Sequence, residues 1–377
     1  MPLLKKYYYL LLSFPTKLLL SLSSIFCKIY LFRYAALCLC LYMKKNSSES
    51  VSKDISYIHC CEQNFISLII PTYNRVNSLN RLLLSLKKQS LPQKYFEIII
   101  INNACTDETQ SLCEQFSNQL RNLRLVYEPT AGLLAARNSG VLAAKGEILT
   151  FCDDDIEPNP AWLSAIMNIM VSHSDIMLLG GNNKGAFEIS QPTFVNSLWI
   201  QDEYGIRINP YYSLIENINQ SMPAPSHTYI MGCNFTTRRS VVNVAQGFGP
   251  DCMPNIIWQG DGETRVSEVA EKMGKVWLDP KVSVLHWMPS SRLTKEYIDK
   301  RKLYFDIAEA YTNLRKLNFS AWKNGDDRYK NKNIYLQLAS NIKELREWII
   351  RESYFGIDTP HIKDIENFSF FFQRHGW

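Results

Sequence analysis

The stretch "FISLIIPTYNRVNSLNRLLLSLKKQSLPQKYFEIIII", residues 65–101, decides the fold class of this chain. It begins and ends with largely apolar runs, 65–71 and 95–101. Such runs are typical of strands buried on both faces of a parallel sheet. Between them lie leucines spaced along one helical face: Leu79, Leu82, Leu83 and Leu86. This spacing predicts an amphipathic helix, and the whole stretch therefore predicts a strand–helix–strand unit.

The same alternation continues along the chain. Helical patterns cover 107–120 and 131–145, and apolar strand patterns cover 123–128 and 147–152. Strands that alternate with helices of this length predict an α/β fold, with a mainly parallel sheet flanked by helices and joined by right-handed crossovers.

Polar residues follow the predicted strands where each strand ends. They are Pro71-Thr72-Tyr73-Asn74, Asn102-Asn103 and Asp153-Asp154-Asp155. Ligands of open parallel sheets bind beyond the carboxyl ends of the strands. We therefore expect these segments to form one binding site on a single rim of the sheet.

The acidic triplet Asp153–Asp155 follows the apolar run 148–151. Hard divalent cations prefer carboxylate oxygens, and Mg²⁺ commonly shares them with substrate phosphates. A structural alternative is that one aspartate caps a helix beginning near Pro158 while the others face solvent. Capping needs only one acid, so the triplet at the end of a strand favours a metal site.

Three segments together resemble the family 2 glycosyltransferases of the GT-A (Rossmann-like) fold. They are "ISLIIPTYNRVNSLNRLLLSL", "FEIIIINNACTDET" and "AGLLAARNSGVLAAKGEILTFCDDDIEPNPAWL". The resemblance is close over about residues 66–172 and looser to about residue 300. It implies that a sugar is transferred, with inversion at the anomeric carbon, from a nucleotide-sugar donor to an acceptor hydroxyl.

The resemblance also implies residues for the nucleotide. Pro71, Thr72 and Tyr73 match the loop that packs on the base, and Asn103 matches a base-reading position. Many members have Asp at that position, which weakens the case for uracil, although a UDP-sugar remains the expected donor. Arg137 matches a helix that approaches the nucleotide, and a guanidinium suits a pyrophosphate. A solvated helix residue is the alternative for Arg137.

The resemblance assigns the metal and the ribose to the acidic triplet. Asp153 and Asp155 match the outer acids of the Asp-x-Asp motif, with Asp155 as the direct ligand of Mn²⁺ or Mg²⁺. Asp153 or Asp154 would contact the ribose. His286 has the position of a further metal ligand, or else it is a structural histidine. Arg292 is an additional candidate for contact with phosphate.

An inverting transfer also needs a carboxylate that accepts the proton of the acceptor hydroxyl. The segment "GDGETRVSEVAEKMG", residues 260–274, resembles the family's base motif at the start of a helix. Asp261 is the first candidate for the base and Glu263 the second. Both acids could instead simply begin the helix.

The sequence predicts three regions. Residues 1–50 form a basic, hydrophobic extension, and 64–290 form the GT-A domain, with a nucleotide-binding part at 64–160 and an acceptor-side part at 161–290. Residues 291–377 form a helical C-terminal region.

The charge of the chain is uneven. Residues 1–45 hold seven basic groups and no acid, whereas the rest of the chain holds 34 basic and 36 acidic residues. The nearly neutral remainder argues against a nucleic-acid partner. Lysine and arginine interrupt every apolar window of the extension, which favours a segment lying on a membrane surface; a signal anchor and a weakly structured extension are the alternatives. Ten cysteines without a Cys-x-x-Cys pair favour free thiols on the cytosolic side of that membrane.

Three other functions are distinguished from sugar transfer by features of the sequence or by their products. A dinucleotide oxidoreductase would carry Gly-x-Gly-x-x-Gly after the first strand, where this chain has "PTYNR". A nucleotidyltransferase would share the metal and phosphate chemistry but would release pyrophosphate. A non-catalytic protein that binds nucleotide sugars would have no use for both Asp155 and Asp261. The expected acceptor is a glycan or a lipid-linked molecule of cell-surface polysaccharide or glycoconjugate synthesis.

Overall fold

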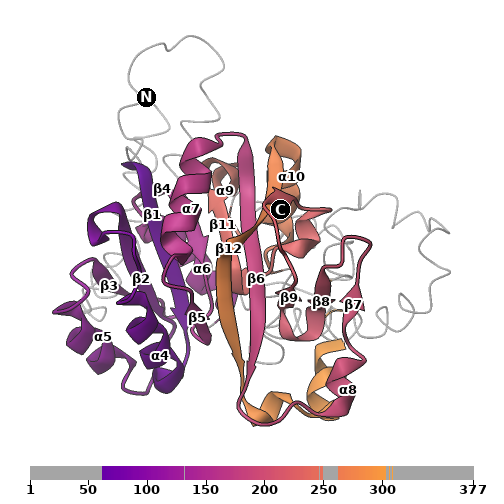
Figure 1. Ribbon diagram of the computed structural model, residues 1–377. Coiled ribbons are helices and arrows are strands. Elements are labelled where there is room, and N and C mark those ends of the chain that lie inside the picture. Colours follow the sequence, from indigo (N-terminus) through magenta and orange to yellow (C-terminus); the bar gives the residue numbers. More distant parts are fainter. Residues whose placement is uncertain are drawn as a thin grey trace, which may run out of the picture. The chain divides into compact units, whose positions relative to one another are not determined.

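The computed structural model describes residues 62–130, 132–245, 247–248, 262–302, 305 and 308 (Figure 1). The predictions for residues 1–50, for Asp261 and for most of the C-terminal region lie outside these residues. Within them, no helix combines the length and apolar character that crossing a bilayer requires.

The described strands form one mixed sheet of twelve strands. They are β1 Glu62–Thr72, β2 Phe96–Asn102, β3 Leu123–Tyr127, β4 Gly146–Phe151, β5 Ile156–Pro158, β6 Ile176–Phe187, β7 Ile200–Gln201, β8 Arg207–Asn209, β9 Leu214–Glu216, β10 Met222–Pro223, β11 Phe235–Arg238 and β12 Lys275–Met288. The main order is β3-β2-β1-β4-β11-β6-β9-β8-β7, and β12 pairs with β5, β6 and β10.

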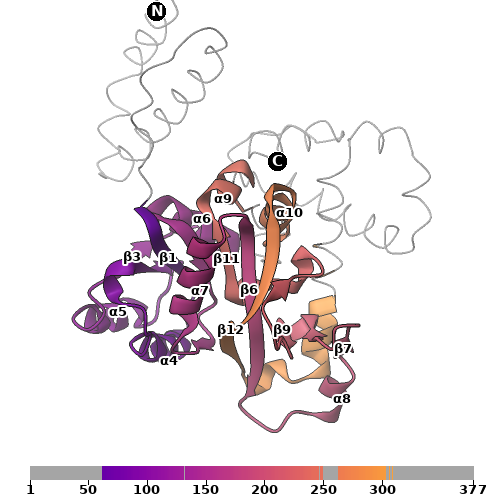
Figure 2. The ribbon, with the colours of Figure 1, turned by 45° about the horizontal axis from the view of Figure 1, so that its top comes forward.

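The first half of the sheet is parallel, as predicted. β2 and β4 both run parallel to β1, with Ile69 beside Ile99 on one side and beside Phe151 on the other. β3 continues the parallel order beyond β2. The second half is mixed, because β11 runs antiparallel to both β4 and β6 while β12 runs parallel to β6 (Figure 2).

The described helices lie on both faces of the sheet. The α-helices are α4 Val76–Leu86, α5 Thr109–Ser117, α6 Leu133–Ala143, α7 Trp162–Ser172, α8 Thr193–Asn196, α9 Arg239–Ala245 and α10 Thr264–Met273. The 3₁₀ helices are η1 Gln93–Tyr95, η2 Pro210–Tyr212, η3 His227–Tyr229, η4 Gly232–Asn234 and η5 Ser290–Arg292.

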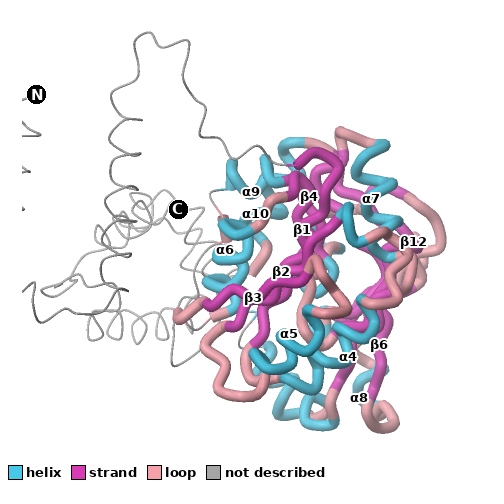
Figure 3. Tube along the Cα trace, turned by 90° about the vertical axis from the view of Figure 1, so that its left-hand side faces the viewer, coloured by secondary structure: helices cyan, strands magenta, loops and turns pink. Residues whose placement is uncertain are grey.

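Alternation along the strands divides the core into two layers. Ile66, Leu68 and Ile70 of β1 pack under α4, α5 and α7. Ile69 points the opposite way, into the layer beneath α6, α9 and α10. Figure 3 shows these two groups of helices on opposite sides of strands β1 to β4. Alternate residues of each apolar strand therefore pack into hydrophobic cores on opposite faces of the sheet.

A third, smaller core lies beside β8 and β9. Tyr212, Leu214 and Met288 pack there with Leu293 and Ile298. The packing of the domain thus continues past residue 290, the boundary predicted from the sequence.

Two predicted helix starts differ from the structure. The helix expected from Asp107 begins at Thr109, because the Asp107 carboxylate accepts hydrogen bonds from the backbone and side chain of Thr109. The helix expected near Pro158 begins at Trp162 instead. Residues 156–158 form β5, which pairs with β12.

Candidate functional site

The acidic triplet connects two strands. Asp153, Asp154 and Asp155 lie between the end of β4 and the start of β5, at the carboxyl edge of the parallel half of the sheet. β5 pairs with β12 in a register that sets Ile156 opposite His286. The backbone N–H of Trp287 donates to the carbonyl of Asp155 at 2.9 Å. This pairing brings a histidine more than 130 positions away to the acids.

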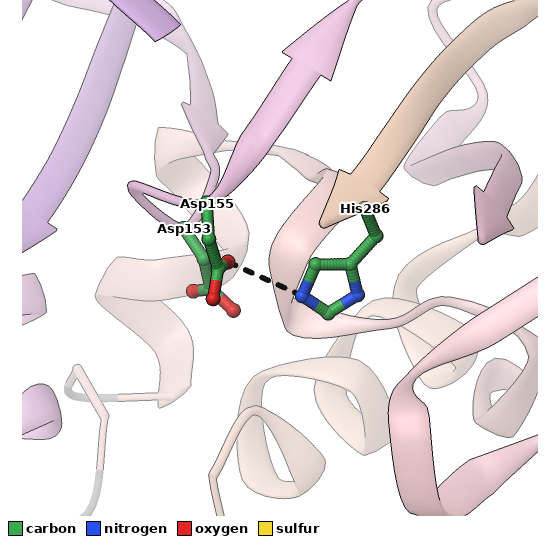
Figure 4. Close-up of side chains that lie close together, drawn as sticks. All are labelled: Asp153, Asp155 and His286. Atoms are coloured by element: carbon green, nitrogen blue, oxygen red, sulfur yellow. Dashed lines mark ion pairs between the residues drawn. The ribbon is translucent and has the colours of Figure 1, made fainter. Parts of the chain in front are cut away.

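Asp153, Asp155 and His286 form a candidate metal site. One ligand atom from each lies within 4.8 Å of the others, and Figure 4 shows the three side chains converging. Asp155 Oδ1 lies 3.2 Å from His286 Nε2. Both atoms are buried, and neither makes a hydrogen bond with a described residue. Two carboxylates and an imidazole with buried ligand atoms unsatisfied fit a divalent cation.

Asp154 does not belong to this cluster and has partners of its own. Its Oδ2 accepts a 2.7 Å hydrogen bond from the Thr72 hydroxyl, and its Oδ1 accepts one of 3.0 Å from Arg75. Burial raises the pKa of Asp154 to about 6, and the Arg75 charge only partly opposes that rise. Asp154 therefore ties the loop after β1 to the end of β4.

Two arginines converge on Asp155. Arg75 Nη1 and Arg292 Nη2 each lie 3.0 Å from its Oδ2. Burial by itself would raise the pKa of Asp155, but His286 and the two arginines outweigh burial, so the pKa lies below its ordinary value. Sequence reasoning raised Arg292 only as a phosphate contact and passed over Arg75. The signal for Arg75 was a cation directly after the "PTYN" segment that ends β1.

A cavity of about 380 Å³ lies beside the acids. Arg75 and Arg292 both line it. So do the predicted nucleotide and acidic residues Pro71, Thr72, Tyr73, Asn103, Asp153, Asp154 and Asp155. The structure thus brings these residues to one rim, as expected from the strand ends, while their individual roles toward a nucleotide stay predictions.

Asn103 uses its side chain to shape the cavity wall. Its amide nitrogen donates to the carbonyls of Thr130 at 2.6 Å and Glu128 at 3.2 Å. Its oxygen accepts from the backbone N–H of Gly132 at 2.8 Å. In this structure Asn103 holds the loop before α6, and its reading of a base stays a prediction.

Arg137 links the triplet to the second half of the chain. Its side chain is buried, and its Nη1 donates to Glu263 Oε2 at 3.2 Å. Its Nη2 donates to the carbonyl of Gly232 and lies 3.6 Å from Asp153 Oδ1. The solvated-helix alternative for Arg137 is therefore wrong, because the guanidinium joins α6, η4, the acids and the start of α10.

Glu263 is held in place from two sides. Besides Arg137, the backbone N–H of Gly232 donates to Glu263 Oε1 at 2.9 Å. A Cβ atom at Gly232 would lie 2.5 Å from Arg137 Nη2 and 2.8 Å from Glu263 Oε2, so a larger residue would displace the ends of these two side chains. Asp261, the first candidate for the base, lies outside the described residues, whereas Glu263 is the N-cap residue of α10.

The chain matches one family model, described as Glycosyl transferase family 2, over residues 67–244. Among curated proteins it is 34% identical over 119 residues to glycosyltransferase AglE of Haloferax volcanii, which covers 31% of this chain and 39% of AglE. It is 35% identical over 125 residues to poly(ribitol-phosphate) beta-N-acetylglucosaminyltransferase TarS of Staphylococcus aureus, which covers 32% of this chain and 22% of TarS. The matches therefore span well under half of these relatives.

Two solved structures are also similar. Mannosyltransferase PcManGT from Pyrobaculum calidifontis, in complex with GDP-Man and Mn²⁺, has a TM-score of 0.48 at 18% identity and covers 76% of this chain and 73% of that chain. S. aureus TarS 1–349 in complex with UDP has a TM-score of 0.43 at 17% identity and covers 77% of this chain and 72% of that chain.

Proposed function

We propose that the protein transfers a sugar from a nucleotide-sugar donor to a hydroxyl of a glycan or lipid-linked acceptor. The premise of this proposal is the match of residues 67–244 to the family 2 glycosyltransferases. The expected donor is a UDP-sugar, and the expected reaction is metal-dependent and inverting. The expected setting is the synthesis of a cell-surface polysaccharide or glycoconjugate.

One observation carries the proposal. Asp153, Asp155 and His286 bring their ligand atoms together, and the two aspartates line a cavity of about 380 Å³. Asp155 Oδ1 and His286 Nε2 are buried and make no hydrogen bond with any described residue. Unsatisfied buried polar atoms are costly, so a cluster of this kind suits a bound cation.

Asp153, Asp155 and His286 would hold a divalent cation. Such a cation, when bound, supplies positive charge that stabilises the departing nucleoside diphosphate. The cavity beside the acids would receive the nucleotide against Pro71, Thr72 and Tyr73. Arg75 and Arg292, which also line this cavity, offer guanidiniums to the diphosphate.

The proposed general base is Asp261 or Glu263, of which Glu263 belongs to the described residues. The carboxylates of Glu263 and Asp153 share one guanidinium, that of Arg137, so Glu263 is linked to the candidate metal site. In an inverting transfer the acceptor oxygen attacks the anomeric carbon as the bond to the diphosphate breaks, and the hydroxyl proton passes to the base. Arg137 and the N–H of Gly232 would orient Glu263 for this step.

The place of action is proposed from the sequence. The seven basic groups and absent acids of residues 1–45 support attachment to the cytosolic face of a membrane. A lipid-linked acceptor would then be presented at the same surface.

Titration calorimetry of the full-length protein with UDP and GDP, with and without Mn²⁺, tests the proposal. The expected result is binding of one nucleotide that depends on Mn²⁺. A folded sample that binds neither nucleotide under either condition would refute the proposal. Release of a nucleoside diphosphate, rather than pyrophosphate, from a bound nucleotide sugar would separate sugar transfer from nucleotidyl transfer.

A further inference from the structure

Two cations of the chain already occupy the acids of the candidate metal site. Arg75 Nη1 bridges Asp154 Oδ1 and Asp155 Oδ2, both at 3.0 Å. Arg292 Nη2 reaches the same Asp155 Oδ2 at 3.0 Å. Both guanidiniums therefore contact Asp155 Oδ2, while Asp155 Oδ1 faces His286.

The charges at the site nearly balance without a ligand. Four carboxylates, those of the triplet and of Glu263, face three guanidiniums, those of Arg75, Arg137 and Arg292. A divalent cation added alone would place two further positive charges beside the arginines. A diphosphate added alone would place negative charge beside the carboxylates. Only the two ligands together preserve the balance, since their charges largely cancel.

The three arginines differ in their freedom to move. The Arg137 side chain is 3% exposed and is fixed by Glu263 and Gly232. The side chains of Arg75 and Arg292 are 44% and 18% exposed and line the cavity. Arg75 lies at the start of α4 but makes no side-chain cap there, so its guanidinium can turn without disturbing the helix.

We infer that Arg75 and Arg292 are exchangeable cations of the donor site. Without donor they neutralise Asp154 and Asp155, and when a divalent cation and a nucleoside diphosphate bind together, they turn from the carboxylates to the diphosphate oxygens. The guanidinium fork suits both partners, because it binds carboxylate and phosphate in the same bidentate way. This inference rests on the proposed function, since it requires a metal and a diphosphate at this site.

If the arginines exchange partners in this way, removing one of them should change the affinities for Mn²⁺ and for the nucleotide in opposite directions. Arg75→Gln removes a competitor for the acids, so Mn²⁺ alone binds more tightly, on the order of tenfold. The same variant loses a charge-assisted contact to the diphosphate, so the nucleotide binds more weakly in saturating Mn²⁺, again on the order of tenfold. The cooperativity between metal and nucleotide, which must be reciprocal, therefore falls in the variant, on the order of tenfold when the affinity for nucleotide alone is unchanged.

The experiment uses full-length protein and four variants. Electron paramagnetic resonance of free Mn²⁺ gives the Kd for the metal alone, and calorimetry gives the Kd for UDP and GDP in saturating Mn²⁺. Arg292→Gln should act in the same directions as Arg75→Gln. Arg75→Lys keeps the charge but not the fork, so it should retain the metal affinity of the wild type and weaken the nucleotide. Arg121→Gln removes the same charge from an exposed position and should change neither Kd.

The outcomes separate the inference from the proposed function. Opposite shifts in Arg75→Gln or Arg292→Gln support exchange, and Arg292→Gln keeps the test valid if Arg75→Gln does not fold. Unchanged or weakened Mn²⁺ binding in the folded variants, with normal binding by the wild type, overturns the exchange alone. A wild type that binds neither Mn²⁺ nor nucleotide overturns the proposed function and the exchange with it.

Discussion

Asp155 has more partners than any other acid of the triplet. Its Oδ2 meets two arginines, its Oδ1 meets His286, and its carbonyl accepts from the Trp287 backbone. The neighbouring Asp154 instead contacts Thr72 and Arg75. Adjacent and chemically identical residues therefore have different roles, because successive side chains leave the β4–β5 connection in different directions.

Asp155→Asn is expected to weaken Mn²⁺ binding by more than roughly 100-fold, since even the loss of a residue that only orients a metal ligand costs 10- to 100-fold. Metal-dependent nucleotide binding is lost with it. Electron paramagnetic resonance of free Mn²⁺ measures the Kd for the metal, and calorimetry measures the Kd for the nucleotide. Asp154→Asn makes the same change at an acid outside the cluster and should retain the metal. Equal losses in both variants would contradict the assignment of Asp155.

Glu263→Gln is expected to lower kcat by roughly 10²- to 10⁴-fold, the usual contribution of a general base. The Kd of the donor should change less than about twofold, because Glu263 does not line the cavity beside the acids. Steady-state kinetics with calorimetry measure both quantities. Asp261→Asn is the parallel variant: a normal rate in Glu263→Gln with a large loss in Asp261→Asn would return the role to Asp261.

Among the elements, two loops of the nucleotide side are joined by one acid. The Asp107 carboxylate accepts from the backbone N–H of Val76, the first residue of α4, at 3.0 Å. It also accepts from the hydroxyl of Thr109, the first residue of α5, at 2.6 Å. Burial raises the pKa of Asp107, but these hydrogen bonds outweigh burial and lower it overall. One side chain thus satisfies the free N–H groups at the start of two helices.

Asp107→Asn is expected to reduce the free energy of unfolding by about 1 kcal/mol at pH 6, as for the loss of a helix cap. The folded pKa lies below the unfolded one, near 3.9. The stabilisation is therefore complete above that value and disappears as the pH falls through the folded pKa. Urea denaturation of both proteins between pH 6 and pH 3 measures the difference. A difference that grows as the pH falls would contradict the prediction.

At the scale of the whole domain, one buried amide joins several elements of the second part of the chain. The side chain of Asn234 accepts from the Trp162 indole at 3.0 Å. It also donates to Asn183 Oδ1 at 3.0 Å and to the carbonyl of Val282 at 3.2 Å. It therefore connects α7, β6 and β12, the last of which carries His286. A buried network of this kind rigidifies a core when every member is satisfied.

Asn234→Ala is expected to lower the free energy of unfolding by roughly 3 kcal/mol or more, because it leaves several buried polar groups without partners. Thermal and urea denaturation measure the loss. Asn118→Ala, at an exposed position, is the control and should change stability by less than about 0.5 kcal/mol. A loss as small as that of the control would show that the network does not stabilise the packing of α7, β6 and β12.

The local pattern of the sequence determined the parallel half of the fold. Apolar runs gave β1 to β4, leucine spacing gave α4, and the polar ends of the strands identified one rim. These features depend on periodicity and on chain order, both of which are present in the sequence. The acidic triplet could be named from its residue types, which suit a cation, whereas His286 was named only through the resemblance to the glycosyltransferase family.

Only the tertiary structure decided how those residues meet. The register of β5 on β12 sets His286 beside Asp155, and Arg137 reaches Glu263 across 126 positions. The arginine pair on Asp155 and the anchoring of a loop by Asn103 likewise depend on contacts between distant segments. Local sequence patterns do not predict which distant side chains come into contact, because strand pairing and side-chain direction are fixed only when the two halves of the sheet pack together.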